Sequence, residues 1–176
     1  MRSRDGGIDR IPLPDGTPGQ LWLCGKHHIA ADVDAVVERT GATTVACLTR
    51  REELSDRYPR YVEWLDERSV LAAIGEHHCS VVWFPIDDLS APDLETYRPF
   101  LEDLAYRLQH GEHIVVHCAA GIGRAGTTAV ALLILLGMDI DNALATVRAN
   151  RPMAGPEVGA QLDLIIELAD ALHSES

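Results

Sequence analysis

The sequence has few basic residues relative to its acidic ones, and this shortage excludes one class of partners. Lysine and arginine number 15 against 27 aspartate and glutamate residues, so the formal net charge is −12 with histidine neutral. A charge of that sign repels polyanions, which disfavours binding to nucleic acid or to an acidic lipid surface. The chain is still 47% hydrophobic and 24% charged, a composition typical of a globular protein that folds without a partner.

Cysteine pairs and long apolar runs are also missing. The four cysteines contain no Cys-x-x-Cys spacing and are too few for a disulfide scaffold, which favours a reducing compartment. The longest unbroken apolar run covers residues 129–136, far below the ~20 residues of a membrane span. Residues 1–7 are polar and lack the apolar stretch of a secretory signal. We therefore expect a cytoplasmic protein without a transmembrane helix.

The length of 176 residues fits one domain. Residues 1–20 are rich in proline and glycine without a hydrophobic period, so we expect an extended N-terminal leader there and a single domain over residues 21–176. Short β-rich runs alternate with longer helical stretches in this domain. The alternation predicts an α/β fold with a central, mostly parallel sheet of about four to five strands flanked by helices. The predicted strands cover residues 20–24, 43–48, 80–85 and 113–117.

Helical patterns fill the segments between and after these strands. Residues 32–40 predict a helix with Asp32 as its N-terminal cap and Gly41 after its end. Residues 124–136 are apolar nearly all round, which is typical of a helix in the middle of a core. The other predicted helices cover residues 58–75, 91–110, 139–149 and 157–173.

A loop with the features of an anion site joins the last predicted strand to this buried helix. It begins at Cys118 and closes at Arg124. Inward N–H groups of a glycine-containing turn, together with a helix N-terminus, favour a phosphate. A loop of this size can place the thiol beneath a phosphorus atom while the guanidinium holds two phosphoryl oxygens. The residues expected to cradle the phosphate are Ala119, Ala120, Gly121, Ile122, Gly123 and Arg124.

The same surroundings favour ionisation of Cys118. Its thiol is expected to lie among amide donors at the helix N-terminus, beside His117 and Arg124, and such neighbours stabilise a thiolate. We therefore expect Cys118 to be ionised at neutral pH and to act as a nucleophile. The alternative is that Cys118 is a small buried hydrophobic residue, the usual role of a single cysteine.

A second loop offers a proton donor for the leaving oxygen of a phosphate ester. Asp87 and Asp88 follow the predicted strand 80–85, so their loop should emerge at the same edge of the sheet as the Cys118 loop. One of the two aspartates is expected to be the acid. The other is expected to be a solvated loop charge or the cap of the following helix.

These two loops resemble those of the cysteine-dependent protein tyrosine and dual-specificity phosphatases. His117-Cys118-x5-Arg124 is similar to their phosphate-binding loop, and the acid loop lies upstream of it as in that superfamily. Low-molecular-weight phosphatases and related arsenate reductases have the opposite order and are excluded. The resemblance spans residues 11–168. Three further segments resemble the kinase-associated (KAP-type) dual-specificity phosphatases and their bacterial relatives, namely residues 47–54, Pro85-Ile86-Asp87-Asp88, and Gln161 within residues 159–162.

The resemblance implies a role for each matching residue. Cys118 would be the nucleophile, Arg124 the phosphate clamp and Asp88 the general acid, with no metal or other cofactor taking part. Gln161 aligns with the glutamine that positions the water hydrolysing the phosphocysteine, although a glutamine on a helix surface is ordinarily just solvated. Ala125 departs from the serine or threonine usual after the arginine, so slow breakdown of the phosphoenzyme is expected.

The implied function is hydrolysis of phosphotyrosine, and of phosphoserine or phosphothreonine as a second class, in phosphorylated proteins. Two alternatives stay open. A pseudophosphatase would bind phosphoproteins and turn over negligibly, whereas the presence of Cys118, Asp88 and Arg124 favours an enzyme. A phosphoinositide or inositol-phosphate phosphatase commonly carries loop lysines, which residues 119–123 lack.

The remaining polar clusters favour structural roles. The His-His-Cys run at residues 77–79, and His113 with residues 117–118, have spacings unlike those of zinc sites, so no metal is expected. Residues 27–28, both histidine, predict a surface turn. Residues 50–53, Arg-Arg-Glu-Glu, favour a solvated charged loop rather than one wall of a substrate cleft.

Overall fold

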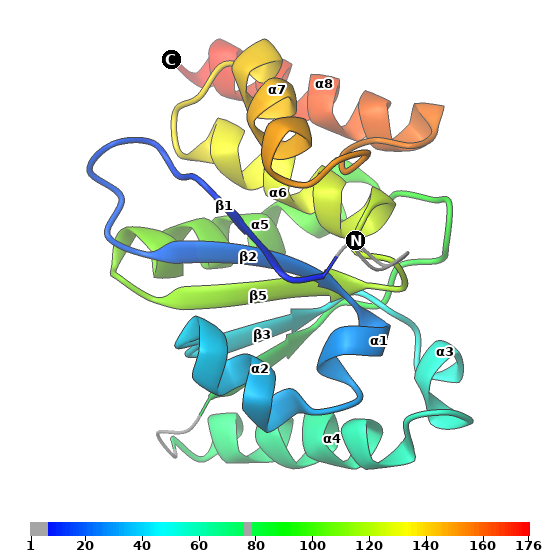
Figure 1. Ribbon diagram of the computed structural model, residues 1–176. Helices are drawn as coiled ribbons and strands as arrows, with labels where there is room; N and C mark the ends of the chain where they lie inside the picture. Colours follow the sequence, from blue (N-terminus) through cyan, green and yellow to red (C-terminus); the bar gives the residue numbers. More distant parts are fainter. Residues whose placement is uncertain (1–6, 76–78) are drawn as a thin grey trace.

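A five-stranded sheet forms the centre of the computed structural model, which describes residues 7–75 and 79–176 (Figure 1). The strands are β1 (Asp9–Ile11), β2 (Gln20–Gly25), β3 (Thr44–Cys47), β4 (Ser80–Trp83) and β5 (His113–Cys118). Their order is β1-β2-β5-β3-β4, and β1 pairs antiparallel with β2 whereas all other pairs are parallel. The predicted α/β fold with a mostly parallel sheet is thus confirmed.

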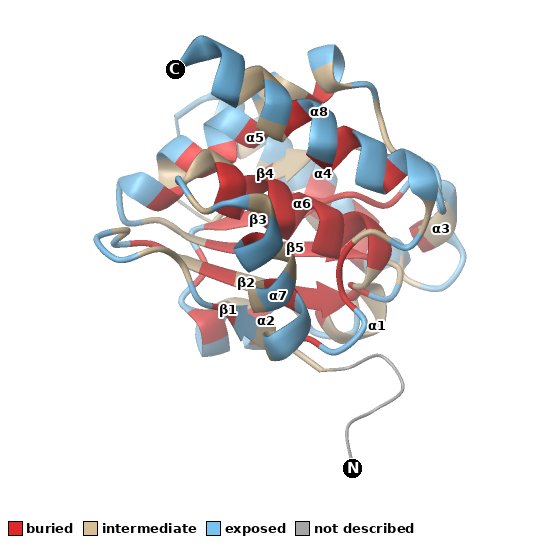
Figure 2. Ribbon diagram, turned by 90° about the horizontal axis from the view of Figure 1, so that it is seen from above, coloured by how far each residue is buried: buried red, intermediate tan, exposed pale blue. Residues whose placement is uncertain are grey.

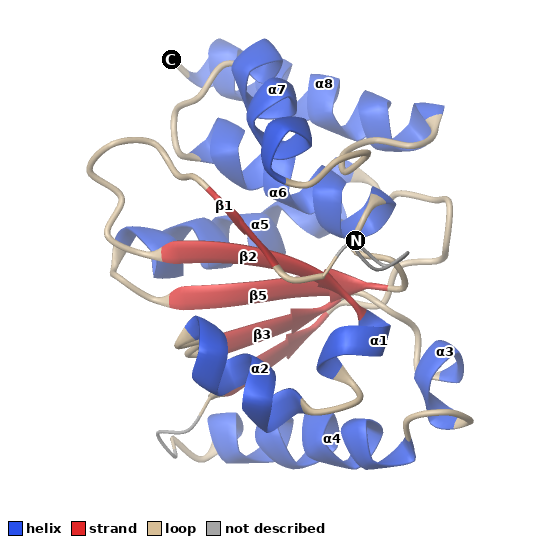
Figure 3. Ribbon diagram, viewed as in Figure 1, coloured by secondary structure: helices blue, strands red, loops and turns tan. Residues whose placement is uncertain are grey.

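Helices cover both faces of the sheet in two layers (Figure 3). One layer holds α1 (Lys26–Ile29), α2 (Val33–Thr40), α3 (Glu52–Ser55) and α4 (Pro59–Ala73). The other holds α5 (Leu94–Gln109), α6 (Gly123–Leu135), α7 (Ile140–Asn150) and α8 (Gly159–Glu175). Each layer buries its own hydrophobic cluster against the sheet. This arrangement follows from parallel strands, whose crossover helices must lie on the faces.

Helix α6 lies in the middle of its layer, as its apolar sequence predicts. Residues 123–134 are all buried, and the helix is red along its length in Figure 2. It contacts α5, α7 and α8 on its outer sides and β2 and β5 beneath. Because a helix packed on every side has little freedom to move, its N-terminus is a rigid support for the loop that precedes it.

Local capping chemistry sets several helix boundaries. Asp32 accepts a hydrogen bond from the backbone N–H of Ala35 at 3.0 Å, and Gly41 ends α2 with a φ of 65°. Both features are as predicted. Asp93 caps α5 through the N–H of Thr96 at 2.9 Å, so this helix begins three residues later than the predicted position 91.

Three short elements differ from the sequence-based expectations. Residues 9–11 lie within the expected extended leader, yet they form β1, and Ile11 is fully buried. Residues 27–28 belong to α1 rather than to a surface turn, and residues 52–55 form α3 rather than a charged loop. These elements are only three or four residues long, so they have no periodicity of their own and depend on the sheet and helices beside them. In residues 7–75 and 79–176, no helix has the length and apolarity that crossing a bilayer requires.

Candidate active site

The loop from Cys118 to Gly123 borders a cavity of about 160 Å³ at the carboxyl ends of the parallel strands. Strand β5 ends at Cys118 and α6 begins at Gly123, so the loop occupies the predicted strand-to-helix junction. Gly121 has a φ of 71°, and a Cβ there would lie 2.4 Å from the carbonyl of Cys24. Only glycine fits this position. The cavity is lined by Asp88, Leu89, Cys118, Ala119, Ala120, Gly123, Arg124 and Glu157.

The loop carbonyls are bound from outside the cavity. The backbone N–H of Lys26 donates to the carbonyl oxygen of Ala119 at 3.0 Å. The guanidinium of Arg151 donates to the carbonyl oxygens of Ala120 and Gly121 at 2.8 and 2.7 Å. Within the described residues, the N–H groups of positions 119–122 donate to no other protein group. Carbonyls held outside and free amides are the arrangement that a bound anion requires.

Arg151 fixes this loop from behind. It is 1% exposed, and besides the loop carbonyls it binds Asp9 Oδ2 at 2.9 Å and the carbonyl oxygen of Gly7 at 2.8 Å through Nη1. A buried guanidinium is stable only when its donors are satisfied, which these oxygens do. Strand β1 is therefore connected to the phosphate loop. The role of Arg151 is not predicted from the sequence, because nothing in the residues around it indicates that it is buried.

The side chain of Arg124 lines the cavity, and Glu53 orients it. Nη1 and Nη2 each donate to one carboxylate oxygen of Glu53 at 2.8 Å, and Nη1 also donates to the carbonyl oxygen of Ile86 at 2.7 Å. Among the residues that the structure describes, none accepts from Nε. The Nε–Nη2 edge thus stays available for two oxygens of a ligand.

The interpretation of residues 50–53 as a solvated charged loop is wrong for Glu53. Its side chain is only 23% exposed, and it is paired with Arg124, which lines the cavity. Burial raises the pKa of Glu53, but hydrogen bonds from Arg124 and from the backbone N–H of Arg50 outweigh it and leave the pKa below its usual range. Glu53 is therefore ionised at neutral pH and holds Arg124 in place.

The structure separates the two candidate acids. Asp88 lines the cavity, with its Oδ1 atom 3.5 Å from Nη2 of Arg124. Asp87 binds Arg50 Nη1 at 2.7 Å in an exposed pair and does not line the cavity. The acid loop thus emerges beside the Cys118 loop, as its position after β4 predicts.

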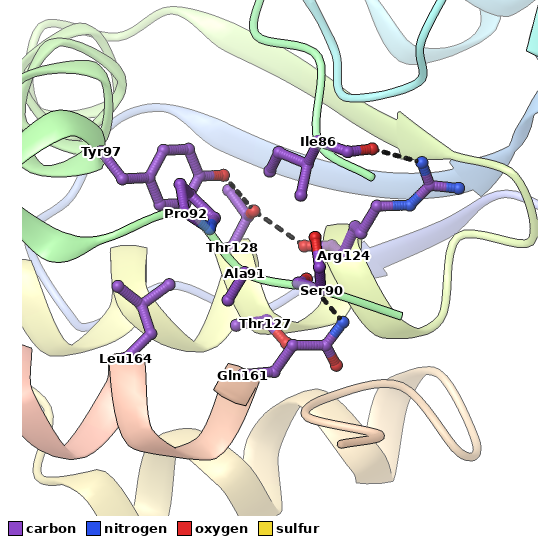
Figure 4. A pocket seen from close by; sticks show the side chains of 10 residues that line it. All are labelled: Ile86, Ser90, Ala91, Pro92, Tyr97, Arg124, Thr127, Thr128, Gln161 and Leu164. Atoms are coloured by element: carbon purple, nitrogen blue, oxygen red, sulfur yellow. Dashed lines mark hydrogen bonds between the residues drawn. The ribbon is translucent and has the colours of Figure 1, made fainter. Parts of the chain in front are cut away.

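Gln161 lies in the first turn of α8 and joins three segments. It is 1% exposed, so its interpretation as a solvated surface residue is wrong. Its Nε2 donates to the carbonyl oxygen of Ser90 at 3.2 Å, and its Oε1 accepts from the N–H of Glu157 at 2.8 Å. Figure 4 shows its amide beneath Ser90, at a small second cavity that also involves Thr127 and Arg124. Gln161 does not line the Cys118 cavity.

Comparisons with known proteins agree with this geometry. The model of the Swiss Army Knife DSP-PTPase phosphatase domain matches residues 17–161. The chain belongs to this phosphatase family. Cyclin-dependent kinase inhibitor 3 of Sus scrofa is 25% identical over 158 residues, which are 88% of this chain and 70% of that protein.

Solved structures show the same fold. A mutant form of Tk-PTP is 26% identical, with a TM-score of 0.68 over 93% of this chain and 97% of that one. Kinase associated phosphatase, with serine replacing its catalytic cysteine, has a TM-score of 0.73 at 20% identity over 95% and 96% of the two chains. As a member of the phosphatase family whose model matches residues 17–161, the protein is an enzyme of the protein tyrosine and dual-specificity phosphatase class.

His117 faces away from the phosphatase cavity. Its Nε2 is 2.7 Å from the hydroxyl oxygen of Tyr61, and both residues are buried on the α4 side of the sheet. Neighbouring residues of a strand point to opposite faces, so Cys118 points to the other side. Burial lowers the pKa of His117 to about 4. It is neutral at neutral pH and adds no positive charge beside the thiol, contrary to the expectation above.

This buried neutral histidine predicts that the phosphatase loses stability in mild acid. Between pH 6.5 and about 4 the unfolded chain takes up a proton at His117 while the folded chain does not, so the free energy of unfolding falls as pH falls through this window, by about 3 kcal/mol in all. Urea denaturation at several pH values measures the slope. His117→Gln should reduce the slope of the free energy of unfolding against pH. His110→Gln, at an exposed site, should leave that slope unchanged. Equal slopes in the wild type and both variants would contradict the assignment of this effect to His117.

Among the described residues that line the Cys118 cavity, none supplies the hydroxyl that Ala125 lacks. Ala125 is fully buried near the start of α6. Thr127 lines the small second cavity, and the hydroxyl of Thr128 donates to the carbonyl oxygen of Arg124 at 2.8 Å. The residues around the Cys118 cavity include neither serine nor threonine.

Of the metal-ligand clusters considered from the sequence, residues 77 and 78 lie outside the described residues. Across positions 7–75 and 79–176, no three histidine, cysteine or acidic side chains are grouped as a metal site would need.

Proposed function

We propose that this phosphatase hydrolyses phosphotyrosine, and phosphoserine or phosphothreonine as a second class, in proteins through a cysteinyl-phosphate intermediate and without a metal ion. The observation that carries the proposal is that Cys118, Arg124 and Asp88 line one cavity. These three groups supply the nucleophile, the anion clamp and the proton donor that phosphate transfer to sulfur requires.

In the first step, the Cys118 thiolate attacks phosphorus and forms the S–P bond while the ester P–O bond breaks. The leaving oxygen takes the proton of Asp88. The three non-bridging oxygens are held by the amides of residues 119–123 and by the Nε–Nη2 edge of Arg124. Glu53 holds the orientation of the Arg124 guanidinium through its two 2.8 Å hydrogen bonds.

In the second step, water attacks the phosphocysteine, and the Asp88 carboxylate takes its proton while the thiolate departs. We assign Gln161 a supporting role in this step. In the resting structure its amide holds the acid loop at Ser90, and release of that bond would let it orient the water. A reducing, cytoplasmic location is part of the proposal, because the nucleophile must stay a free thiol.

The lining of the cavity supports this function over the two alternatives. Among the described residues that line it, Arg124 is the only cation, so the lining does not provide the several positive charges that a polyphosphorylated inositol would need. A pseudophosphatase would not need an acid beside the nucleophile, yet Asp88 lines the same cavity as Cys118.

The test is steady-state turnover of an aryl phosphate, a phosphotyrosine peptide and a phosphothreonine peptide in excess chelator. We expect the aryl phosphate and phosphotyrosine peptide to be hydrolysed at rates that chelator does not change. Tight peptide binding without turnover would favour the pseudophosphatase, and loss of activity in chelator would contradict the metal-independent mechanism.

Ala125 predicts that breakdown of the phosphoenzyme limits turnover. Without a hydroxyl to stabilise the departing thiolate, an activated aryl phosphate should give a burst of phenol of about one equivalent per site. Ala125→Ser should shrink the burst and raise kcat by ~10-fold, if one hydrogen bond to a charged group contributes about 1.5 kcal/mol. Stopped-flow kinetics measures both, with Ala129→Ser, also buried on α6, as the control. The absence of a burst in the wild type, together with unchanged turnover in Ala125→Ser, would show that phosphoenzyme breakdown does not limit turnover.

A further inference from the structure

A second carboxylate, that of Glu157, also lines the cavity and has no role in the reaction steps proposed for Cys118, Arg124 and Asp88. Glu157 precedes α8 and lines the cavity together with Asp88. Its carboxylate lies against the backbone of Gly123, because a Cβ at Gly123 would be 2.0 Å from Oε2 of Glu157. Gly123 is the first residue of α6. The negative charge of Glu157 is thus at the wall where the phosphate loop meets the helix.

The segment that carries Glu157 is fixed to this position. The N–H of Gly155 donates to the carbonyl oxygen of Ile122 at 3.1 Å, and the N–H of Glu157 donates to Gln161 at 2.8 Å. A Cβ at Gly126 would lie 2.2 Å from the backbone nitrogen of Gly155, so α6 and this segment are in direct contact. The fold therefore fixes the backbone that carries Glu157, and the exposed side chain lies against Gly123 at the cavity wall.

The charge of Glu157 is not compensated within the described residues. Its carboxylate forms no ion pair there, whereas Arg124, the one cation of the lining, is already paired with Glu53. Asp88 must carry a proton to act as the acid of the first step, which leaves it neutral at that point. Glu157 is then the negative charge that a substrate meets beside its phosphate.

We propose that Glu157 is a specificity-determining residue that favours monophosphorylated substrates with a neutral or basic residue beside the phosphorylated one. A second anionic group at that position would lie near Glu157, and the described lining offers no cation besides Arg124, which holds the phosphate. Like charges placed together oppose binding. A lysine or arginine there would be attracted instead. This inference rests on the proposed function, because it concerns the substrate of the same cavity.

The experiment compares phosphotyrosine peptides that differ only in having Lys, Gln or Glu next to the phosphotyrosine. For the wild type, we expect kcat/KM to fall by about threefold to tenfold from the Lys to the Glu peptide at low ionic strength, as two charges near a protein surface predict, mainly through KM. The difference should shrink in high salt. Glu157→Gln should reduce it to less than about twofold and Glu157→Lys should reverse it. Glu167→Gln, on the exposed side of α8, should leave it unchanged.

Two results would overturn the inference. One is a peptide preference that persists in Glu157→Gln and Glu157→Lys. The other is an equal loss of kcat on all peptides in Glu157→Gln, which would make Glu157 part of the reaction rather than of selection. If the wild type hydrolyses no peptide, the proposed function fails separately, and peptide affinities measured by fluorescence anisotropy with Cys118→Ser decide the inference. Equal affinities for the Lys and Glu peptides would then reject it.

Discussion

Replacing Cys118 by serine is expected to abolish turnover while leaving the fold and oxyanion binding largely intact. The serine hydroxyl stays protonated at neutral pH, so it cannot replace the thiolate as the nucleophile. The phosphate cradle does not depend on that side chain, because the carbonyls of Ala119, Ala120 and Gly121 are held by Lys26 and Arg151. Activity should thus fall below a few per cent of wild type, whereas tungstate affinity should change by less than about tenfold.

Turnover of an aryl phosphate and tungstate binding by calorimetry measure the two halves of this expectation. Cys79→Ser is the matched control, since that thiol lies before β4 and outside the cavity. A serine variant at position 118 that keeps more than a few per cent of activity would remove the proposed nucleophile. Loss of tungstate binding with an unchanged melting curve would show that the sulfur itself forms the anion site.

The parts of the site that the sequence predicts are those that are local in the chain. Cys118, the loop and Arg124 are continuous, and the apolar run that follows them indicates a buried helix without knowledge of any other segment. Strand alternation is equally local. It places Cys118 and His117 on opposite faces of the sheet, so alternation alone predicts that His117 lies outside the thiolate's surroundings.

The parts that the sequence does not predict depend on contacts between distant segments. Glu53 pairs with Arg124 across 71 positions, and Arg151 reaches the loop across 30 and Asp9 across 142. A charged residue looks the same in sequence whether it lies in solvent or against a buried partner. Gln161 shows the same limit, because its amide donates to the carbonyl oxygen of Ser90 across 71 positions.

Substituting the general acid is expected to give the second large loss of activity, and it distinguishes Asp88 from Asp87. Asp88→Asn should lower kcat/KM by about 10²–10⁴ on an alkyl or tyrosyl phosphate, because kcat/KM reports the first step, in which the leaving oxygen then departs without a proton. The loss should be much smaller on an activated aryl phosphate, whose leaving group needs none. Asp87→Asn is the matched control, since Asp87 binds exposed Arg50 and lies outside the cavity; its kcat/KM should stay close to wild type.

The pH dependence separates a lost proton donor from a distorted loop. In the wild type, kcat/KM should be bell-shaped, because one limb requires ionised Cys118 and the other requires protonated Asp88. Asp88→Asn should lose the limb on which activity falls as pH rises and keep the limb on which it rises. A structural disturbance would lower the whole profile and leave its shape unchanged. If Asp87→Asn instead loses that limb and Asp88→Asn keeps it, the acid is Asp87 and the Arg50 pair must open during catalysis.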